Sequence, residues 1–249
     1  MRFNIGEIEI NNTDLLKCLN SIKEAVKQGT FGYICVTNVR TAYLANQNPD
    51  YLRIQNSSLM TVPDGMPLVW YAHRTGYKNV GRVSGTDLMN ALFAVSPAEQ
   101  YSHYFYGSTE DTLKKLSANI SAKYPGIILK KCVSPPFQPV ADINVEELAA
   151  ELNLLKPTFF WAGLGAPKQE YLADRLQPLL TGTICIGVGL SFEYLAGTVK
   201  RAPQWAQRAG LEWMFRMIQQ PEKIKRIVLP FFWFLQIWLQ SFFIREIRS

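Results

Sequence analysis

Short apolar runs rich in β-branched and aromatic residues recur along the chain, and a stretch with helical spacing follows each of them. Runs of this kind predict strands buried on both faces, as in a parallel sheet. Strands that alternate with helices predict an α/β fold, here a mostly parallel, Rossmann-like sheet flanked by helices. The predicted strands lie at residues 31–37, 103–107, 126–133, 158–165 and 183–189, and the predicted helices at residues 38–47, 108–124, 144–155, 166–180 and 190–197.

Three of the predicted strands end in glycine. These residues are Gly107, the pair Gly163 and Gly165, and the pair Gly187 and Gly189. In an open parallel sheet the ligand crevice lies at the carboxyl ends of the strands, where glycine lets a phosphate approach the backbone. Glycine also permits any tight turn, so a single one indicates little. Three such strand ends together favour a nucleotide-type ligand.

Composition is that of a folded globular protein: 48% of the 249 residues are apolar and 18% are charged. That length is enough for one good core. The four cysteines have no C-x-x-C spacing and no histidine near them, so we expect free thiols, no bound metal and no cofactor. The first residues lack the apolar core of a signal peptide, and we expect no export signal there.

The charge of +6 is confined to the last fifth of the chain. Residues 1–199 contain 17 basic and 17 acidic residues, whereas residues 200–249 contain nine basic and three acidic ones, and 9 − 3 gives +6. The division predicts two parts. We expect residues 1–199 to form an α/β domain, the catalytic one if the chain is an enzyme, and residues 200–249 to form a basic, aromatic helical appendage suited to associate with a membrane.

Residues 227–244 carry no charge and are flanked by basic residues. A transmembrane helix needs about 20 apolar residues, and Pro230 and two glutamines one turn apart argue against a span. Trp233 and Trp238 favour a helix that lies in the membrane interface, with the flanking cations on anionic lipid. The alternative is a helix packed on the protein's own core or at a subunit interface. A hydrophobic tail also favours self-association.

The segment VPDGMP contains an acid between two turn formers. Pro63 and Gly65 favour a tight turn, and Asp64 has the right place to cap a helix that starts near Met66. A carboxylate at a strand-to-helix junction, beside the ligand edge of a sheet, is also where a general base is placed. The spacing alone leaves both interpretations open.

Five segments together resemble the WecG/TagA/CpsF family of bacterial glycosyltransferases, in the family's order and at its spacing, from about residue 30 to residue 226. The resemblance implies an inverting, metal-independent enzyme at the cytoplasmic face of the bacterial plasma membrane. Such an enzyme moves a sugar, for example N-acetylmannosamine or a related hexose derivative, from a UDP-sugar to a polyprenyl-pyrophosphate-linked sugar, for a surface polysaccharide or teichoic-acid-like polymer. The segments are PDGMPLVW (63–70), RVSGTDLM (82–89), GLGAPKQE (163–170), GVGLSFEYLAGTVKRAP (187–203) and GLEWMFRMIQQPEKIKR (210–226).

The same resemblance implies roles for individual residues. Asp64 is the family's proposed general base, and a positioned carboxylate of this kind is what a sugar hydroxyl needs to become a nucleophile. Glu193 stands where the family commonly has aspartate and reaches one methylene further, which leaves the donor sugar open. The residues expected to bind substrate are Thr37, Asn38, Arg82, Gln169 and Glu193, with Gly107, Gly163, Gly165, Gly187 and Gly189 framing the nucleotide and with Arg216, Lys223 and Arg226 in the tail.

The UDP leaving group develops negative charge, which a metal, cations or helix N-termini must stabilise. The chain has no D-x-D motif, and its nearest imitation, Glu7-x-Glu9, lies in an alternating stretch typical of a surface strand. A metal ion is therefore the less favoured partner for this negative charge, and the candidates are Arg82 and the three tail cations. For Arg82 the alternative is an ordinary surface ion pair; for the tail cations it is plain attraction to lipid.

Other functions remain open on sequence grounds. A non-catalytic adaptor could bind a nucleotide-sugar or lipid at the membrane and dock a partner through its aromatic tail. A nicotinamide oxidoreductase is disfavoured because GVGLSF has Phe192 in place of the third glycine. Nucleic-acid binding is not expected, since the basic tail carries a long uncharged apolar stretch. The surface expected to meet an anionic membrane is residues 204–249.

Overall fold

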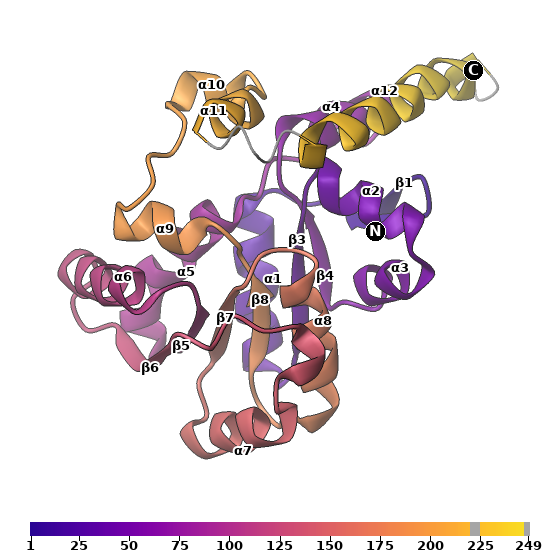
Figure 1. Cartoon of the computed structure of the whole chain (residues 1–249). Helices are drawn as coiled ribbons and strands as arrows, with labels where there is room; N and C mark the ends of the chain where they lie inside the picture. The colour runs from indigo at the N-terminus through magenta and orange to yellow at the C-terminus, as the bar shows by residue number, and fades with distance from the viewer. Residues whose placement is uncertain (220–224, 247–249) are drawn as a thin grey trace.

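A six-stranded parallel sheet forms the centre of the computed structural model, which describes residues 1–219 and 225–246 (Figure 1). Its strands lie in the order β4-β3-β8-β7-β5-β6, and all five neighbouring pairs are parallel. The predicted α/β class is confirmed. The strands are β3 (Gly32–Thr37), β4 (Met60–Pro63), β5 (Ser102–Gly107), β6 (Ile128–Val133), β7 (Phe159–Gly163) and β8 (Ile184–Gly187).

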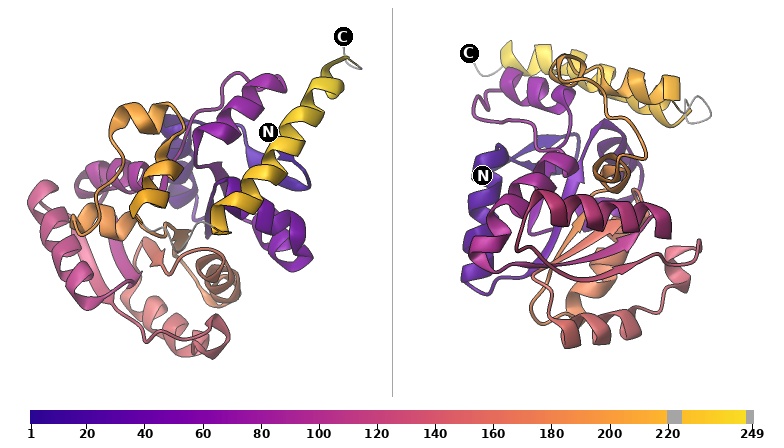
Figure 2. Two further views of the ribbon diagram at one scale, coloured as in Figure 1. Left: turned by 45° about the horizontal axis from the view of Figure 1, so that its top comes forward. Right: turned by 90° about the vertical axis from the view of Figure 1, so that its left-hand side faces the viewer.

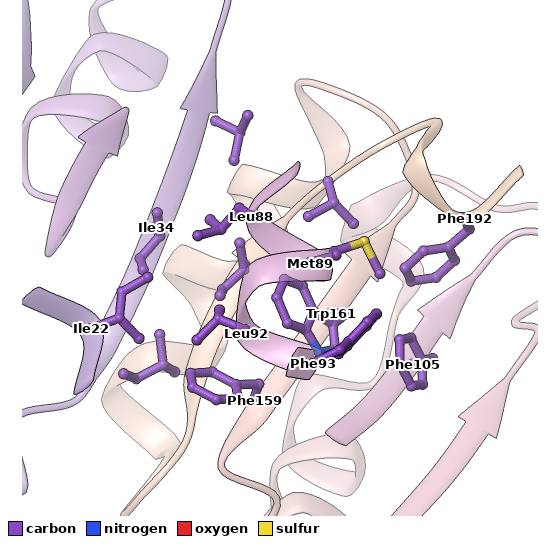
Figure 3. Close-up of a cluster of buried hydrophobic side chains, with 14 of the residues drawn as sticks. Ile22, Ile34, Leu88, Met89, Leu92, Phe93, Phe105, Phe159, Trp161 and Phe192 are labelled. Atoms are coloured by element: carbon purple, nitrogen blue, oxygen red, sulfur yellow. The ribbon is translucent and has the colours of Figure 1, made fainter. Parts of the chain in front are cut away.

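Helices cover both faces of this sheet (Figures 1 and 2). One face carries an apolar core that includes Phe93, Phe105 and Trp161 together with Phe192 at its upper end (Figure 3). The other face carries a second core that contains Tyr104 and Phe160. The first face is covered by α1 (Leu15–Lys27), α5 (Gly85–Glu99), α6 (Glu110–Lys123) and α9 (Ser191–Ala196), and the second by α3 (Pro49–Asn56), α7 (Val145–Leu155) and α8 (Lys168–Leu176).

The two edges of the sheet are protected in different ways. At one edge, the middle of β6 exposes Lys130 and Lys131, charged side chains that discourage pairing with another strand. At the other edge, the hairpin β1 (Arg2–Ile5) and β2 (Ile8–Asn11) lies against β4, where the Asn11 side chain accepts a hydrogen bond of 2.8 Å from the Thr61 backbone. The surface strand expected around Glu7-x-Glu9 is thus β2 and its turn. Two short 3-10 helices, Val140–Asp142 and Gln177–Leu179, complete the loops.

A third apolar cluster joins the two ends of the chain. The hairpin, α2 (Val39–Gln47) and α4 (Met66–Arg74) supply most of it, and Phe234 of α12 (Lys225–Glu246) completes it. Figures 1 and 2 show α12 lying along the outside of α2 and α4, beside α10 (Gln204–Arg208) and α11 (Glu212–Gln219). The expected appendage is therefore helical. The division into domains at residue 199 stays a prediction.

The α12 helix has a packed face and an exposed face. On the packed side, the Trp233 ring meets Tyr43 at 5.8 Å, and Arg74 donates a hydrogen bond of 3.1 Å to the buried Ser241 hydroxyl. On the outer side, Val228, Phe232 and Leu239 are 40%, 61% and 54% exposed. One face of α12 packs on the protein's own core, as the alternative interpretation of residues 227–244 expects. The other face exposes apolar side chains, and its contact with a membrane stays a prediction. Within the described ranges, no helix combines the length and apolarity that a membrane crossing requires.

Candidate active site

The residues expected to form a site lie along one edge of the sheet, the edge at which the strands end. Asn38 follows β3 and Asp64 follows β4, while Gly107, Gly163 and Gly187 are the last residues of β5, β7 and β8. Neighbouring strands lie about 4.8 Å apart, so the end of β4 and the end of β7 are separated by about 14 Å. Only an extended ligand would touch both.

Asp64 does not cap a helix. The α4 helix begins at Met66, its N-cap is Gly65, and no side chain caps it. Pro67 in the first turn has no N–H group, which reduces the need for a cap. Instead the Asp64 backbone donates a hydrogen bond of 2.6 Å to the Thr37 carbonyl, so that the residue extends the pairing of β3 and β4 by one step. The capping interpretation is wrong, and the carboxylate lies at the rim of a pocket.

Thr37 and Asn38 differ in what they present to this pocket. Thr37 is fully buried, and its hydroxyl donates to the Gln55 side chain at 2.7 Å. Asn38 is half-buried and caps α2, because its side-chain oxygen accepts from the Arg40 and Thr41 backbones at 3.0 and 3.2 Å. The amide nitrogen of Asn38 carries two further N–H donors. Substrate contact by either residue stays a prediction.

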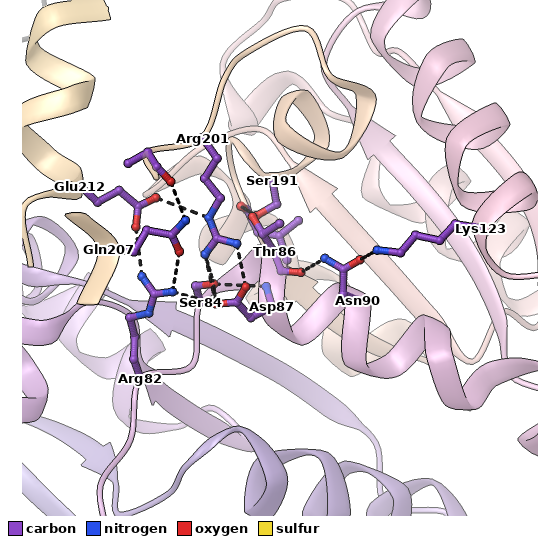
Figure 4. A network of polar contacts seen from close by, with 12 residues as sticks. Arg82, Ser84, Thr86, Asp87, Asn90, Lys123, Ser191, Arg201, Gln207 and Glu212 are labelled. Atoms are coloured by element: carbon purple, nitrogen blue, oxygen red, sulfur yellow. Dashed lines mark hydrogen bonds and ion pairs between the residues drawn. The ribbon is translucent and has the colours of Figure 1, made fainter. Parts of the chain in front are cut away.

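Arg82 sits in a polar network that links the core to the appendage (Figure 4). Its guanidinium donates to Asp87 at 2.9 Å, to Gln207 at 2.9 Å and to Glu212 at 3.2 Å. Gln207 and Glu212 belong to α10 and α11, so Arg82 ties these helices to the start of α5. The side chain is 17% exposed, which makes this a partly buried ion pair rather than a surface one.

Arg201 shares the same acids. It donates to both oxygens of Asp87, at 2.7 and 3.1 Å, and one nitrogen also bonds the Ser84 hydroxyl. Burial opposes the charge on Arg201, but the bonds to Asp87 and the charges of Glu212 and Asp64 hold its pKa above the usual value. Burial likewise opposes the charge on Asp87, yet the bonds from Arg201 and Ser84 keep its pKa below the usual value. Both groups are therefore charged at neutral pH.

Gln169 joins two loops at the end of the sheet. Its side-chain oxygen accepts from the backbones of Gly165 and Gly189 at 3.1 and 3.0 Å, and its nitrogen donates to Glu170 at 2.8 Å. Burial raises the pKa of the fully enclosed Glu170 carboxyl. An alanine at Gly187 would place its Cβ 2.7 Å from the Gln169 amide. Gln169 is only 3% exposed, and its side chain is already engaged by these loops. Its expected contact with a sugar stays a prediction.

Glu193 lies beside the ends of β5 and β7. Its carboxylate accepts a hydrogen bond of 2.8 Å from Ser108, and its second oxygen is buried with no hydrogen-bond partner in the described part of the chain. Gly107 has a φ of +126°, and a Cβ there would lie 2.6 Å from the Gly163 backbone. The following helices leave β5 and β7 in opposite directions along the sheet, the arrangement that opens a ligand crevice. These positions suit a nucleotide, which stays a prediction.

A pocket of about 560 Å³ connects the sheet edge to the appendage. Its polar end contains Asn38, Asp64 and Arg82, which the sequence brought forward, and Arg40, which it did not. Arg40 donates to the Ala166 carbonyl at 3.1 Å and so joins α2 to the loop after β7. The opposite walls come from α4, α11 and α12 and are apolar except for Glu212, which together with Gln207 of α10 faces the pocket near Arg82. A volume of this size is usual for a ligand site.

Three kinds of expected residue are not in this pocket. Thr37 and Glu193 are not among the residues that line it. The five glycines and Gln169 lie further along the same edge. The tail cations cannot be placed: Lys223 lies outside the described residues, and so do the side chains of Arg216 and Arg226, although α11 and α12 contain those two positions. Sequence reasoning missed Arg40, Asp87, Glu170, Arg201, Gln207 and Glu212, of which Asp87, Glu170, Arg201 and Glu212 stand inside the resembling segments.

The fold and the pocket define an α/β enzyme with a carboxylate, an amide and guanidinium groups at the carboxyl edge of a parallel sheet. The chain belongs to the glycosyl transferase WecG/TagA/CpsF family, whose model matches residues 3–246. It is therefore a glycosyltransferase, as the resemblance implied.

Two relatives of known activity match most of the chain. A Bacillus subtilis (strain 168) protein is 29% identical over 225 residues, which cover 90% of this chain and 85% of the relative. A Staphylococcus aureus (strain MW2) protein is 26% identical over 222 residues, which cover 88% of this chain and 85% of the relative. Both are named N-acetylglucosaminyldiphosphoundecaprenol N-acetyl-beta-D-mannosaminyltransferase.

Proposed function

We propose that this enzyme transfers a hexose derivative from a UDP-sugar to a sugar linked through diphosphate to a polyprenol. The names of the relatives supply the class of acceptor and suggest N-acetylmannosamine as the sugar moved. The observation that carries the proposal is the position of Asp64. Its carboxylate lines the pocket beside Asn38 and Arg82 and leaves the helix behind it uncapped. A structural role in the helix therefore does not account for this acid.

In the proposed reaction Asp64 acts as the general base. The acceptor hydroxyl gives its proton to the carboxylate as its oxygen forms a bond to the anomeric carbon of the donor. The bond from that carbon to the β-phosphate oxygen breaks, and UDP leaves with the bonding electron pair. Attack from the side opposite the leaving group inverts the anomeric centre.

The negative charge on the leaving diphosphate needs a partner. Arg82 lines the pocket and has five N–H donors in a planar fork that suits phosphate, although Asp87 and Glu212 already engage it. Arg216, Lys223 and Arg226 are proposed as further partners, in keeping with the basic character of residues 200–249. No group of three or more metal-binding side chains occurs among the residues described.

We further propose that the enzyme works at the cytoplasmic face of the plasma membrane, where α12 attaches it to anionic lipid. The exposed residues Val228, Phe232, Leu235, Leu239 and Phe242 follow one another at intervals of four, three, four and three, which aligns them on one side of the helix. We call these five residues the outer stripe. A row of large apolar side chains at the surface is typical of an interfacial helix.

The test is UDP release from a panel of UDP-sugars, with and without a short-chain polyprenyl-diphosphate-linked N-acetylglucosamine. Wild type is expected to release UDP from one donor only when the acceptor is present. Asp64→Asn should lower kcat by about 100- to 10,000-fold, the contribution of a general base, while UDP still binds. The control is Asp111→Asn, which changes an exposed carboxylate of α6 and should keep full activity. Near-normal turnover by Asp64→Asn would sink the assigned role.

A further inference from the structure

The pocket at Asp64 has two chemically different ends. Asn38, Asp64 and Arg82 give one end charge and hydrogen-bonding groups. The other end is lined by large apolar side chains from three helices, and its polar neighbours are few. The apolar residues that matter here are Met66, Trp70, Trp213, Phe231, Phe234 and Trp238.

Close packing between helices holds the side chains of the apolar end in place. The turn between α10 and α11 packs directly on Trp70, because a Cβ at Gly210 would lie 2.6 Å from that ring. The Trp213 and Phe231 rings meet at 6.0 Å and join α11 to α12. Yet Trp70 and Phe231 remain 41% and 47% exposed. Partly exposed aromatic side chains gathered around one cavity mark a site for an apolar ligand.

The diphosphate and sugar of a nucleotide-sugar are polar, and its single base would stack on only part of a wall made of several aromatic side chains. The wall is also continuous with the outer stripe, because Leu235 belongs to both: it lines the pocket and is 40% exposed on α12. A ligand with a polar head at Asp64 and an apolar chain would satisfy both ends of the pocket. Its chain would leave over α12 toward the side of the helix that carries the stripe.

We propose that the apolar wall between α4 and α12 binds the first isoprene units of the acceptor's polyprenyl chain. The inference rests on the proposed function and deepens it by assigning a second part of the acceptor to named residues. The wall holds the chain so that the sugar and diphosphate stand at the polar end, beside Asp64. The chain then passes from the wall to the bilayer along Leu235 without crossing water.

The first test compares two acceptors that carry the same sugar diphosphate, one linked to a farnesyl chain and one to an ethyl group, below the concentration at which the farnesyl compound forms micelles. For wild type, the KM of the farnesyl acceptor should be at least tenfold lower. Trp70→Ala and Leu235→Ser should each raise the farnesyl KM at least fivefold and bring it closer to the KM of the ethyl acceptor measured with the same variant. Equal KM values for the two acceptors in wild type would overturn the proposal.

Leu239→Ser is the matched control. Leu239 lies one turn beyond Leu235 on the same stripe and is similarly exposed, but it does not line the pocket. Both variants lose one leucine from the stripe, so their binding to vesicles should weaken alike. Only Leu235→Ser should lose preference for the farnesyl acceptor in solution. If the two variants show the same preference, the wall has no part in chain recognition and the proposal fails.

A binding measurement separates this inference from the proposed function. Tryptophan fluorescence, titrated with farnesyl diphosphate and separately with inorganic diphosphate, reports on the pocket through Trp70, Trp213 and Trp238. Saturable binding of farnesyl diphosphate that Trp70→Ala weakens supports the wall, even if no acceptor yields UDP and the proposed function falls. Equal affinities for the two compounds, or an affinity for farnesyl diphosphate that Trp70→Ala leaves unchanged, would contradict the proposed role of the wall. Neither result would affect the proposed transferase activity, which UDP release tests separately.

Discussion

At the scale of single residues, Gly65 decides where the Asp64 carboxylate lies. Its φ of +118° is one that only glycine adopts without strain, and the nearest atom to an added Cβ would be 3.7 Å away. Strain, rather than a clash, is therefore the cost of a side chain there. Gly76 offers a comparison, because it has a φ of +104°, open space around it, and no place in the pocket.

We expect Gly65→Ala and Gly76→Ala to lower the free energy of unfolding by a similar amount, roughly 1–3 kcal/mol, the usual cost of such a backbone conformation. Only Gly65→Ala should lower kcat, because its turn sets the position of the proposed base. Chemical denaturation and UDP release measure the two effects. Full kcat in Gly65→Ala would show that the turn does not position Asp64.

Glu170 gives a prediction about pH. Burial raises its pKa above the usual 4.5, so the folded protein holds this proton more tightly than the unfolded chain does. Stability contributed by the protonated group is complete below pH 4.5 and is lost as the pH rises through the raised pKa. Glu170→Gln cannot titrate. Relative to wild type, its melting temperature should therefore increase as the pH rises from 4.5 through the raised pKa and level off above it.

Glu151 is the control with the opposite sign. Burial opposes the charge on this residue, but hydrogen bonds from Lys131 and Tyr104 lower its pKa overall. Its contribution is present above the usual pKa and is lost as the pH falls through the lowered one. Glu151→Gln should thus lose stability relative to wild type as the pH rises. Parallel profiles for wild type and Glu170→Gln would mean that Glu170 does not titrate differently on folding.

At the scale of elements, α12 is held by one face and free to act with the other. Replacing Val228, Phe232 and Leu239 together by serine removes three members of the outer stripe and leaves the packed face unchanged. Complete burial of a large apolar side chain stabilises by about 1.5–3 kcal/mol. Because wild type inserts these three side chains in part, it should bind vesicles at least about tenfold more tightly than the triple variant does. Co-sedimentation with anionic vesicles measures this loss.

The control for the triple variant changes three exposed leucines elsewhere, Leu16, Leu154 and Leu179, to serine. It alters hydrophobicity by a similar amount on α1, α7 and a 3-10 turn. Vesicle binding should stay at the wild-type level. Equal losses in both triple variants would mean that binding follows general hydrophobicity rather than α12.

At the scale of the whole molecule, charge is divided unevenly: residues 1–199 are neutral and residues 200–249 carry +6. The Debye length falls from about 10 Å at 0.1 M salt to about 3 Å at 1 M. Raising NaCl over this range should weaken binding to anionic vesicles at least about tenfold, since each cation near such a surface contributes about 1 kcal/mol. Binding to neutral vesicles should barely change. Similar salt curves for both lipids would rule out an electrostatic share.

Much of the fold could be predicted because five of the six strands of the sheet lie in short apolar runs, although Lys130 and Lys131 interrupt the run of β6, and the helices after them follow the expected spacing. The strand β4, MTVP, is only four residues long and ends in proline, so no run marked it. The network around Arg82 could not be predicted either, because its bonds between residues 1–199 and residues 200–249 join positions 114 to 130 apart. Hydrophobic periodicity relates only residues that are a few positions apart. Family resemblance singled out Asp64, Asn38 and Arg82, which line one pocket, while their roles stay predictions. It could not reveal that α12 divides its faces between core and surface.

The pocket unites residues from near the two ends of the sequence, and this has a consequence for the newly made chain. A ribosome adds about 5–20 residues per second, so roughly 9–35 s pass between the synthesis of Asp64 and that of Trp238. Throughout that interval the proposed base is present without the part of the wall that α11 and α12 supply, and the apolar sides of α2 and α4 lack their cover. A nascent chain is thus incomplete at the pocket and exposes these apolar surfaces until its last helix emerges. During this interval a chaperone or a bilayer has exposed apolar surface to bind.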